Sequence, residues 1–532
     1  MYNTEIIMKK LIGLVVIVAA LVLGGYYGMG LVTESTLKRN VDVVNQSNGL
    51  FVDIEQYDRG WFTSTATLNW RLHIPERLVK DQNGQSTTVP AQDHKIQMPL
   101  IIYHGPIIYT GTGVRFGLGF ASSELTLPPM YVQKFSNLFT SASEQPKLSL
   151  SVFVNYLNNS RLNIGLPAFK LIAKQGGDQF DWYGMQTEFS VSSNLKNIDG
   201  TVSIDGASMI KNKMKAILGK VSSDYNFHQT DAGLYLGEAS LSVPSFVVSE
   251  SDQKVFEVEQ FALSSNSDVN SGLFNSYFNT SLNKVTVRNK IYGPAVLDMS
   301  IKNLDAEVLA NINEQANKMQ QGMTDSERQQ ALFALLPQLP KLFSKGAQFE
   351  ISKLSLAMPE GAIVGDMLVS LPKGDAGNPF QLLQKVQGQG KLTIPAQVLK
   401  DFVVISLKQK LVSQPALQQA MVQQMQNNAA AATTEQAQAP ADASTPAVTP
   451  PPAATASQVT APADPASQEA VKPMTIADLE QQAQVQADQK LSTLVQNGLL
   501  TLQGSEYVIE ISFLQGQLSI NGKPFNPAML QF

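Results

Sequence analysis

The chain lacks cysteine and has little histidine. With no cysteine among 532 residues, disulfides, thiolate metal sites and cysteine nucleophiles are excluded, so stability has to come from packing and hydrogen bonds. The four histidines, His73, His94, His104 and His228, have no second histidine or carboxylate at metal-ligand spacing. The sequence therefore predicts no metal site and no cofactor, and it favours a structural role for His104, at the end of an apolar strand, over a catalytic one.

Basic charge is scarce as well. The formal net charge is −5, the isoelectric point is near 5.6, and lysine and arginine are scattered along the chain. Proteins that bind nucleic acid usually carry a basic patch or stripe, so we expect no nucleic-acid partner.

The common catalytic motifs are also missing. The chain has no G-x-S-x-G sequence, Gly388–Thr393 lacks the first glycine of a phosphate-binding loop, and Gly111–Gly117 lacks the dinucleotide-binding spacing. Distant carboxylate pairs, as used by glycoside hydrolases, leave no local signature. The sequence predicts no catalytic residue and favours a protein without enzymatic activity. A hydrolase of envelope polymers ranks third, after the two non-enzymatic functions given below.

One long apolar run is present. The 22 residues from Leu11 to Val32 carry no charge and as a helix would span roughly 33 Å, enough for a bilayer core of about 30 Å. Because Lys9 and Lys10 precede the run, we expect the N-terminus in the cytoplasm and the body on the far side, with Tyr26 and Tyr27 near the far interface. A cleaved signal peptide is the alternative, but its apolar region is usually shorter.

Small residues line one side of this expected anchor. Ala20, Gly24 and Gly28 lie four apart and include a G-x-x-x-G sequence, which lets two membrane helices approach closely. A homodimer through the anchor is one interpretation, although small residues are frequent in membrane helices in general.

Alternation of polar and apolar residues recurs beyond the anchor. From Thr63 to Leu72, for example, threonine, asparagine and arginine alternate with alanine, leucine and tryptophan, as in a strand with one buried face. Further alternating runs are Lys147–Leu157, Thr187–Leu195, Gly233–Val248, Lys254–Ser265, Ser281–Gly293 and Tyr507–Gly522. Turn-forming pairs at Asn83-Gly84, Asp199-Gly200, Asp205-Gly206 and Asn521-Gly522 and short connections favour antiparallel pairing.

Helical periodicity appears in Asn303–Gly346, Pro395–Asn428 and Ile476–Gly498. The predicted fold class is therefore α+β and β-dominated: an N-terminal single transmembrane helix, then a large, mainly antiparallel, curved sheet with helices packed on or beside it. The Ala/Pro/Thr/Gln-rich segment 429–473 lacks an apolar period and should be disordered.

We expect four segments: a cytoplasmic start and anchor (1–32), a β-rich domain (33–428), the disordered insertion (429–473), and a helix with C-terminal strands that rejoin the domain (474–532). Two short echoes, Tyr103–Pro106 and Ile291–Pro294, hint at an internal duplication within the β-rich domain.

Several landmarks in this order resemble the YdgA/YihF family of Gram-negative envelope proteins. They are the Lys-Lys anchor, Gly60-Trp61 within Arg59–Ser64, His104-Gly105-Pro106, Asn303-Leu304-Asp305, and Asn521-Gly522 at the end of Gly516–Gly522. The resemblance implies a protein held in the bacterial inner membrane by a single pass, with its bulk in the periplasm and no established enzymatic activity.

These observations favour a membrane-anchored periplasmic protein of cell-envelope maintenance or scaffolding, whose partners are the inner membrane and envelope proteins. The alternative is binding or transfer of lipid or another hydrophobic ligand along the apolar side of the sheet. The two hypotheses differ in whether the protein's own helices cover that side.

Overall fold

The computed structural model describes residues 22–39, 41–42, 45, 50–74, 77–80, 86–111, 113–320, 333–374, 379–411 and 476–526. The chain divides into two compact units. The first comprises Met1–Thr393 and Glu510–Pro524, and the second comprises Ile394–Ile509 and Phe525–Phe532.

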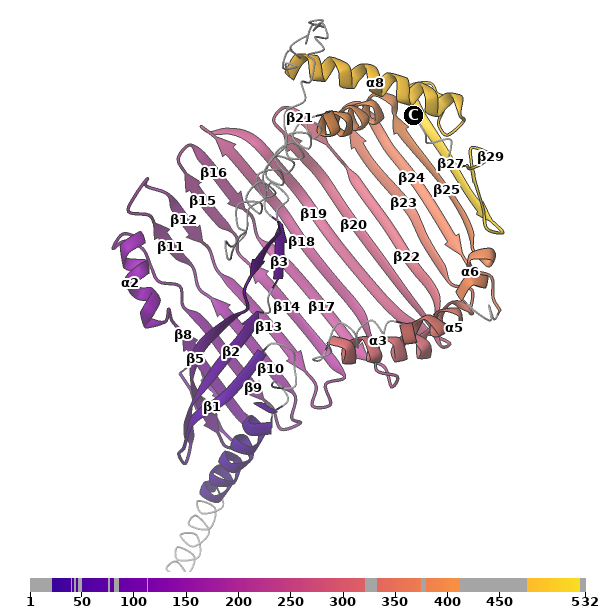
Figure 1. Ribbon diagram of the computed structural model, residues 1–532. Helices are drawn as coiled ribbons and strands as arrows, with labels where there is room; N and C mark the ends of the chain where they lie inside the picture. Colours follow the sequence, from indigo (N-terminus) through magenta and orange to yellow (C-terminus); the bar gives the residue numbers. More distant parts are fainter. Residues whose placement is uncertain are drawn as a thin grey trace, which may run out of the picture. The chain divides into compact units, whose positions relative to one another are not determined.

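An antiparallel sheet dominates the first unit (Figure 1). Its strands follow one another in sequence order, through hairpins or through connections that contain shorter elements, and each pairs with the next. In order across the sheet they are β1 (Leu50–Arg59), β2 (Thr63–Ile74), β5 (Gln92–His104), β8 (Gly119–Leu125), β9 (Leu148–Val154), β10 (Ser160–Leu166), β13 (Met185–Val191), β14 (Asn197–Ile204), β17 (Val221–Gln229), β18 (Tyr235–Glu250), β19 (Gln253–Asn270), β20 (Leu273–Val287), β22 (Ala295–Asp305), β23 (Gln348–Met358), β24 (Gly361–Ser370) and β25 (Gln387–Pro395). The expectation of a β-dominated fold with a large antiparallel sheet is confirmed.

A second row of strands extends part of this sheet lengthwise. The first half of β18 pairs with β17 and its second half with β16. The row consists of β11 (Phe169–Ile172), β12 (Gln179–Trp182), β15 (Ala207–Lys211) and β16 (Met214–Leu218). Asp205-Gly206, read from the sequence as a turn, is a bend between β14 and β15, where Gly206 has φ of +115°.

The prediction of a turn at Asp199-Gly200 is wrong, since both residues lie inside β14. A Cβ at position 200 would approach the ring of Tyr225 to 2.7 Å and that of Phe189 to 3.1 Å. The glycine therefore makes room for two aromatic rings on neighbouring strands, and tertiary packing overrides the local turn preference.

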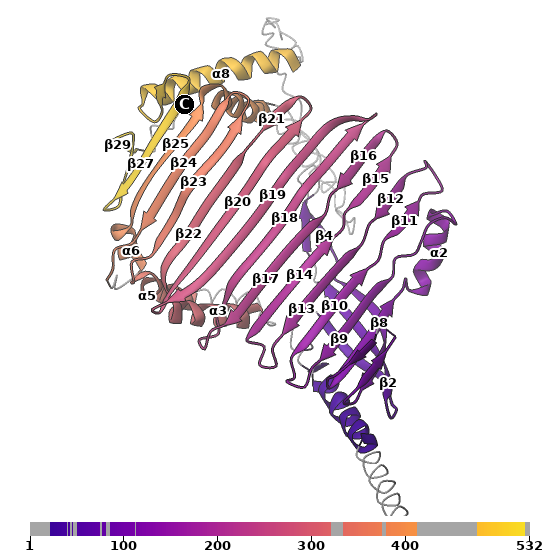
Figure 2. The ribbon, with the colours of Figure 1, turned by 180° about the vertical axis from the view of Figure 1, so that it is seen from behind.

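Short elements surround the sheet. They are α2 (Pro129–Leu138), α3 (Ala306–Gln320), η1 (Leu336–Gln338), α5 (Leu339–Phe343), α6 (Pro379–Lys385), and the hairpins β3 (Arg77–Lys80) with β4 (Ser86–Val89) and β6 (Ile108–Thr110) with β7 (Gly113–Arg115). The short strand β21 (Lys290–Tyr292) belongs to the sheet itself and pairs with the end of β20. Figure 2 shows the same unit from behind, and in both views α3 and α5 lie along one end of the strands around β17 to β22.

Asp305 starts α3. Its Oδ1 accepts hydrogen bonds from the backbone nitrogens of Glu307 and Val308, at 3.2 and 3.1 Å, as an N-terminal cap does. Asn303 precedes it with φ of +62°, so the Asn-Leu-Asp sequence ends β22 and turns the chain into the helix.

The second unit contains a helix at residues 396–411, α8 (Ile476–Gln496), β26 (Thr501–Gln503) and the start of β27 (Glu506–Leu514). Val404 and Leu407 pack against Ala483 and Ala487 of α8. Beyond Ile509 the chain belongs to the first unit, where β27 pairs with β28 (Gln517–Ile520) and β28 with β29 (Lys523–Pro524). Asn521 there has φ of +50° in the expected turn.

Of the expected anchor Leu11–Val32, the part up to Leu21 lies outside the described residues, and this part includes Ala20 of the expected dimer face. Residues 22–39 form a helix. Within the described part of the chain, no helix combines the length and apolar character that a membrane span requires. The segment 429–473 also lies outside the described residues.

Candidate functional site: an uncovered apolar sheet face

One face of the sheet carries an apolar row that crosses thirteen strands from β5 to β24. Directly paired residues of antiparallel strands place their side chains on the same face. The successive partners are Ile102, Ala121, Val152, Leu162, Phe189, Gly200, Tyr225, Ala239, Ser265, Phe278, Met299, Ile351 and Met367. The rings of Phe189 and Tyr225 lie 5.4 Å apart along it. A parallel row contains Leu241, Leu263 and Leu297.

The next position along each strand is polar. From β8 to β23 the successive partners are Ser122, Ser151, Asn163, Glu188, Thr201, Asp224, Ser240, Ser264, Asn279, Asp298 and Lys353. The sheet is therefore apolar on one face and polar on the other, as alternation requires.

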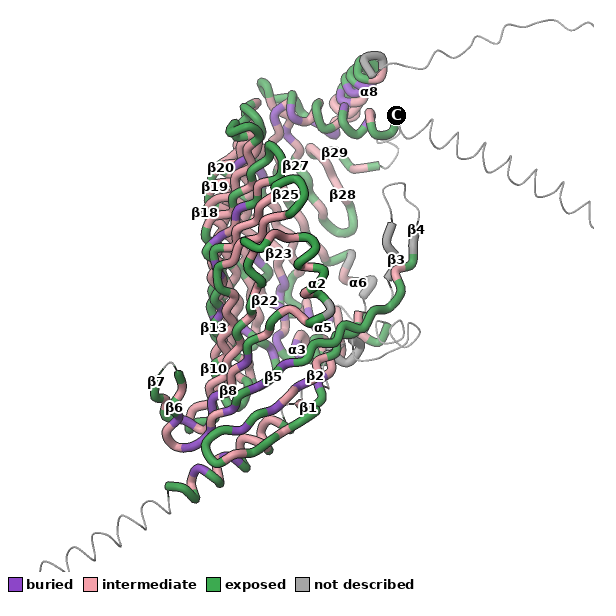
Figure 3. Tube along the Cα trace, turned by 90° about the vertical axis from the view of Figure 1, so that its left-hand side faces the viewer, coloured by how far each residue is buried: buried purple, intermediate pink, exposed green. Residues whose placement is uncertain are grey.

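The apolar face has no cover over its middle. Among the described strands β13 to β24, the buried hydrophobic side chains are Leu236 and Leu304, which pack beside α3 and α5 at the strand ends. The other apolar side chains of these strands are of intermediate exposure or exposed. Figure 3 shows this burial pattern along β18, β19 and β20. Since a sheet normally buries its apolar face against a second layer, this face is available for a ligand or a partner.

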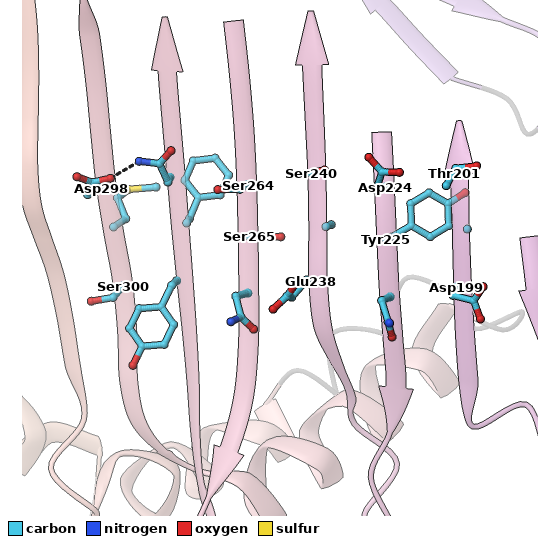
Figure 4. A pocket seen from close by; sticks show the side chains of 18 of the residues that line it. Asp199, Thr201, Asp224, Tyr225, Glu238, Ser240, Ser264, Ser265, Asp298 and Ser300 are labelled. Atoms are coloured by element: carbon cyan, nitrogen blue, oxygen red, sulfur yellow. Dashed lines mark hydrogen bonds between the residues drawn. The ribbon is translucent and has the colours of Figure 1, made fainter. Parts of the chain in front are cut away.

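The polar face holds a shallow open trough of about 850 Å³. Figure 4 shows polar side chains from β14 to β22 projecting side by side, with the hydrogen bond that Asn279 donates to Asp298. Lys302 lies 2.7 Å from Glu350, and its hydrogen bond and charge lower the pKa of that carboxyl. Within the described residues, no group of three His, Cys, Asp or Glu side chains is arranged to hold a metal ion.

A separate apolar cavity of about 260 Å³ lies between the N-terminal helix (residues 22–39) and strands β1, β2, β5, β8 and β9. Val32 and Leu37 line it from the helix, and Ile102, Ala121 and Val152 line it from the sheet. These last three residues begin the apolar row described above. The cavity and the uncovered face are thus parts of one continuous apolar surface.

The N-terminal helix is docked on this end of the fold. Tyr26 is buried, its hydroxyl donates to the carbonyl of Ile107 at 2.6 Å, and its ring meets Phe62 edge-on at 4.8 Å. Arg59 lies 3.2 Å from Glu34 and stacks over the ring of Tyr27. These contacts join the helix to segments of the chain that are 25 to 81 residues away.

Beneath the helix, His104 and Ser64 form a buried polar pair. Both are 1% exposed, and Ser64 Oγ lies 3.0 Å from His104 Nε2. His104 Nδ1 has no hydrogen-bond partner among the described residues. Burial lowers the pKa of His104, although the nearby Tyr26 backbone opposes the shift. A Cβ on Gly30 would approach the imidazole to 2.8 Å. The pair is sealed from substrate, so its geometry favours a structural role.

The sequence landmarks occupy three places. Gly60, Trp61, His104, Gly105 and Pro106 surround the docked helix; the ring of Trp61 lies 5.5 Å from that of Tyr27, and a Cβ on Gly105 would overlap Tyr26. The others act locally, since Asn303 and Asp305 form the start of α3, and Asn521 and Gly522 form the turn after β28.

Gly24 and Gly28 of the expected dimer face have open space beside them: a Cβ added at either position would meet no described atom within 4 Å outside its own helix backbone and chain neighbours. Sequence reasoning missed the role of Tyr26 and the continuity of the apolar row. The alternating pattern carried the signal for the row, but the order of the strands was needed to read it.

Comparison with known proteins places the chain in a family. The profile described as "Bacterial protein of unknown function (DUF945)" matches residues 8–528. The chain belongs to this family. Protein YdgA of Escherichia coli (strain K12) is 23% identical over 429 residues, which cover 74% of this chain and 83% of that protein. No solved structure matches.

Proposed function

We propose that this protein is anchored in the bacterial inner membrane by its N-terminal apolar run and binds lipid acyl chains along the apolar face of its periplasmic sheet. The observation that carries the proposal is the row from Ile102 to Met367, which is apolar except for Ser265 and in which no apolar side chain from Phe189 onward is buried. Exposed apolar patches larger than a few hundred Å² commonly mark binding surfaces.

The dimensions of the face suit acyl chains. Nine strands from β13 to β24 at about 4.8 Å spacing give a row of roughly 40 Å. One leaflet of a bilayer core is about 15 Å deep, so the row is long enough for more than one acyl chain. The row also starts in the cavity against the N-terminal helix, where an anchored protein would meet membrane lipid.

Scaffolding is the second candidate, because an envelope protein could cover the same face. The Tyr225 and Phe227 rings, stacked 6.3 Å apart on β17, would suit a protein partner as well as a lipid. Acyl chains are favoured because the apolar row is continuous with an apolar cavity of about 260 Å³.

The test uses the full-length chain in vesicles that contain a photoactivatable phospholipid, followed by mapping of the lipid-modified peptides. Leu263 faces the apolar side, and Ser264, the next residue of β19, lines the polar trough. We expect lipid adducts on β18 to β20, and we expect Leu263→Asp to reduce them several-fold while Ser264→Asp leaves them unchanged.

Adducts on the N-terminal helix provide an internal control, because Leu263→Asp should not alter them. An absence of adducts from β18 to β20 in the wild type, with adducts present on the helix, would contradict lipid binding by the sheet. If the same strands instead crosslinked to an envelope protein in cells, scaffolding would replace lipid binding as the function.

A further inference from the structure

The fold carries a rim of exposed aromatic and apolar side chains around the N-terminal helix. The rim consists of Trp61, Phe62, Tyr109, Phe116, Tyr156 and Leu157. Trp61 is 58% and Leu157 is 76% exposed. These residues come from the turn between β1 and β2, the hairpin β6–β7 with its following residue, and the turn between β9 and β10.

Side-chain contacts hold these segments against the helix and against one another. Phe62 packs on Tyr26, and Trp61 packs on Tyr27. The hydroxyl of Tyr156 donates to the carbonyl of Pro106. The hydroxyl of Tyr26 donates to the next carbonyl, that of Ile107. The rim is therefore one surface, built on strand ends.

The helix leads from this rim toward the part of the chain that lies outside the described residues. Val22 and Leu23 are exposed there, and the sequence before them, Leu11–Leu21, continues the uncharged apolar run. An uncharged run of this length is suited to a bilayer core. Tyrosine and tryptophan are enriched at the membrane–water interface, because each has an apolar ring and a polar group.

We propose that this aromatic rim lies in the surface of a phospholipid bilayer, as a second membrane contact beside the helix. The inference rests on the anchored placement in the proposed function. It goes beyond that placement because it specifies which surface of the β-rich domain faces the bilayer. Val32 lies five residues after Tyr27, or roughly 8 Å along the helix, so the cavity it lines is held close to the bilayer surface.

The absence of cysteine makes the test direct, because one introduced cysteine is the only labelling site. Trp61→Cys and Leu157→Cys place a fluorescent label on the rim. Ile291→Cys is the matched control, since Ile291 is 55% exposed in β21, far from the helix in Figure 1. Each labelled full-length protein is reconstituted in phosphatidylethanolamine–phosphatidylglycerol vesicles, with or without lipids that carry a doxyl quencher near the headgroup.

We expect several-fold stronger quenching by doxyl lipid at both rim positions than at Ile291, together with protection of the rim from iodide in the water. Equal quenching at all three positions, or rim labels open to iodide while the protein stays in the vesicles, would overturn the inference and leave the anchor in place. Disulfide-linked dimers of Trp61→Cys would also overturn it, because the rim would then contact a second copy. Loss of the wild-type protein from vesicles in alkaline carbonate would refute the anchored placement as well.

Discussion

Acidification should lower the stability of the fold through His104, which is buried beneath the N-terminal helix. The imidazole is buried beside Ser64, and burial lowers its pKa below the usual 6.5. The unfolded chain therefore binds a proton more readily than the folded chain at mildly acidic pH. Stability is complete above about pH 6.5, and it falls as the pH drops from the unfolded pKa toward the folded one.

The magnitude is bounded by one proton. A full one-proton difference changes the free energy of unfolding by about 1.4 kcal/mol per pH unit. Because the unfolded histidine is only partly protonated near pH 6.5, going from pH 7 to 5.5 should cost at most about 1.3 kcal/mol. The carboxyls with lowered pKa, such as Glu350 and Glu257, lose their contributions only at lower pH, below their usual value of 4.5.

The assay is urea unfolding of the full-length protein in non-ionic detergent, followed by tryptophan fluorescence. We expect the wild-type midpoint to fall between pH 7 and 5.5, and His104→Gln to be less stable at pH 7 but to lose this pH dependence. His228→Gln changes an exposed histidine and should keep the wild-type slope. A flat wild-type profile, or an unchanged slope in His104→Gln, would refute the reasoning.

Two further substitutions probe the fold by the same unfolding assay. Asp305→Ala removes the acceptor for the Glu307 and Val308 backbone nitrogens and should cost about 1 kcal/mol, whereas Asp305→Asn should retain most of the stability; equal losses would contradict a capping role. Gly206→Ala places a Cβ 2.5 Å from the carbonyl of Leu218 at a φ of +115° and should cost more than about 1 kcal/mol, whereas Gly111→Ala, with open space at its Cβ, should have little effect.

The strands were predictable because alternation depends on local sequence. Along β2, Ser64, Ala66 and Leu68 are buried while Thr63 and Thr65 are exposed, as alternation along a strand predicts. The pairing of β18 with both β16 and β17 was not predictable. It depends on bends at Gly206 and Gly219, where a Cβ would meet neighbouring strands, and a local pattern cannot distinguish such bends from hairpin turns.

The contacts of the N-terminal helix show a different limit of prediction from sequence. Hydropathy assigns Leu11–Val32 to a bilayer with Tyr26 near its far interface, yet Tyr26 and Gly30 are buried against the protein. Their partners, Ile107 and His104, lie more than 70 residues away. Hydropathy cannot separate burial in lipid from burial against protein, because both environments select apolar side chains.

The unlike faces of the sheet constrain what can cover it. The polar row through Glu188, Asp224 and Asp298 can remain in water. The apolar row through Phe189, Phe278 and Met299 is unfavourable to hydrate, and an apolar surface of this length promotes aggregation when it faces water. The helices α3 and α5 pack only at the ends of the strands around β18 to β22, to one side of this row. A covering lipid would remove the apolar row from water while leaving the polar row hydrated. Because Val152 belongs both to this row and to the cavity under the helix, a lipid that entered the cavity would meet the first residues of the row.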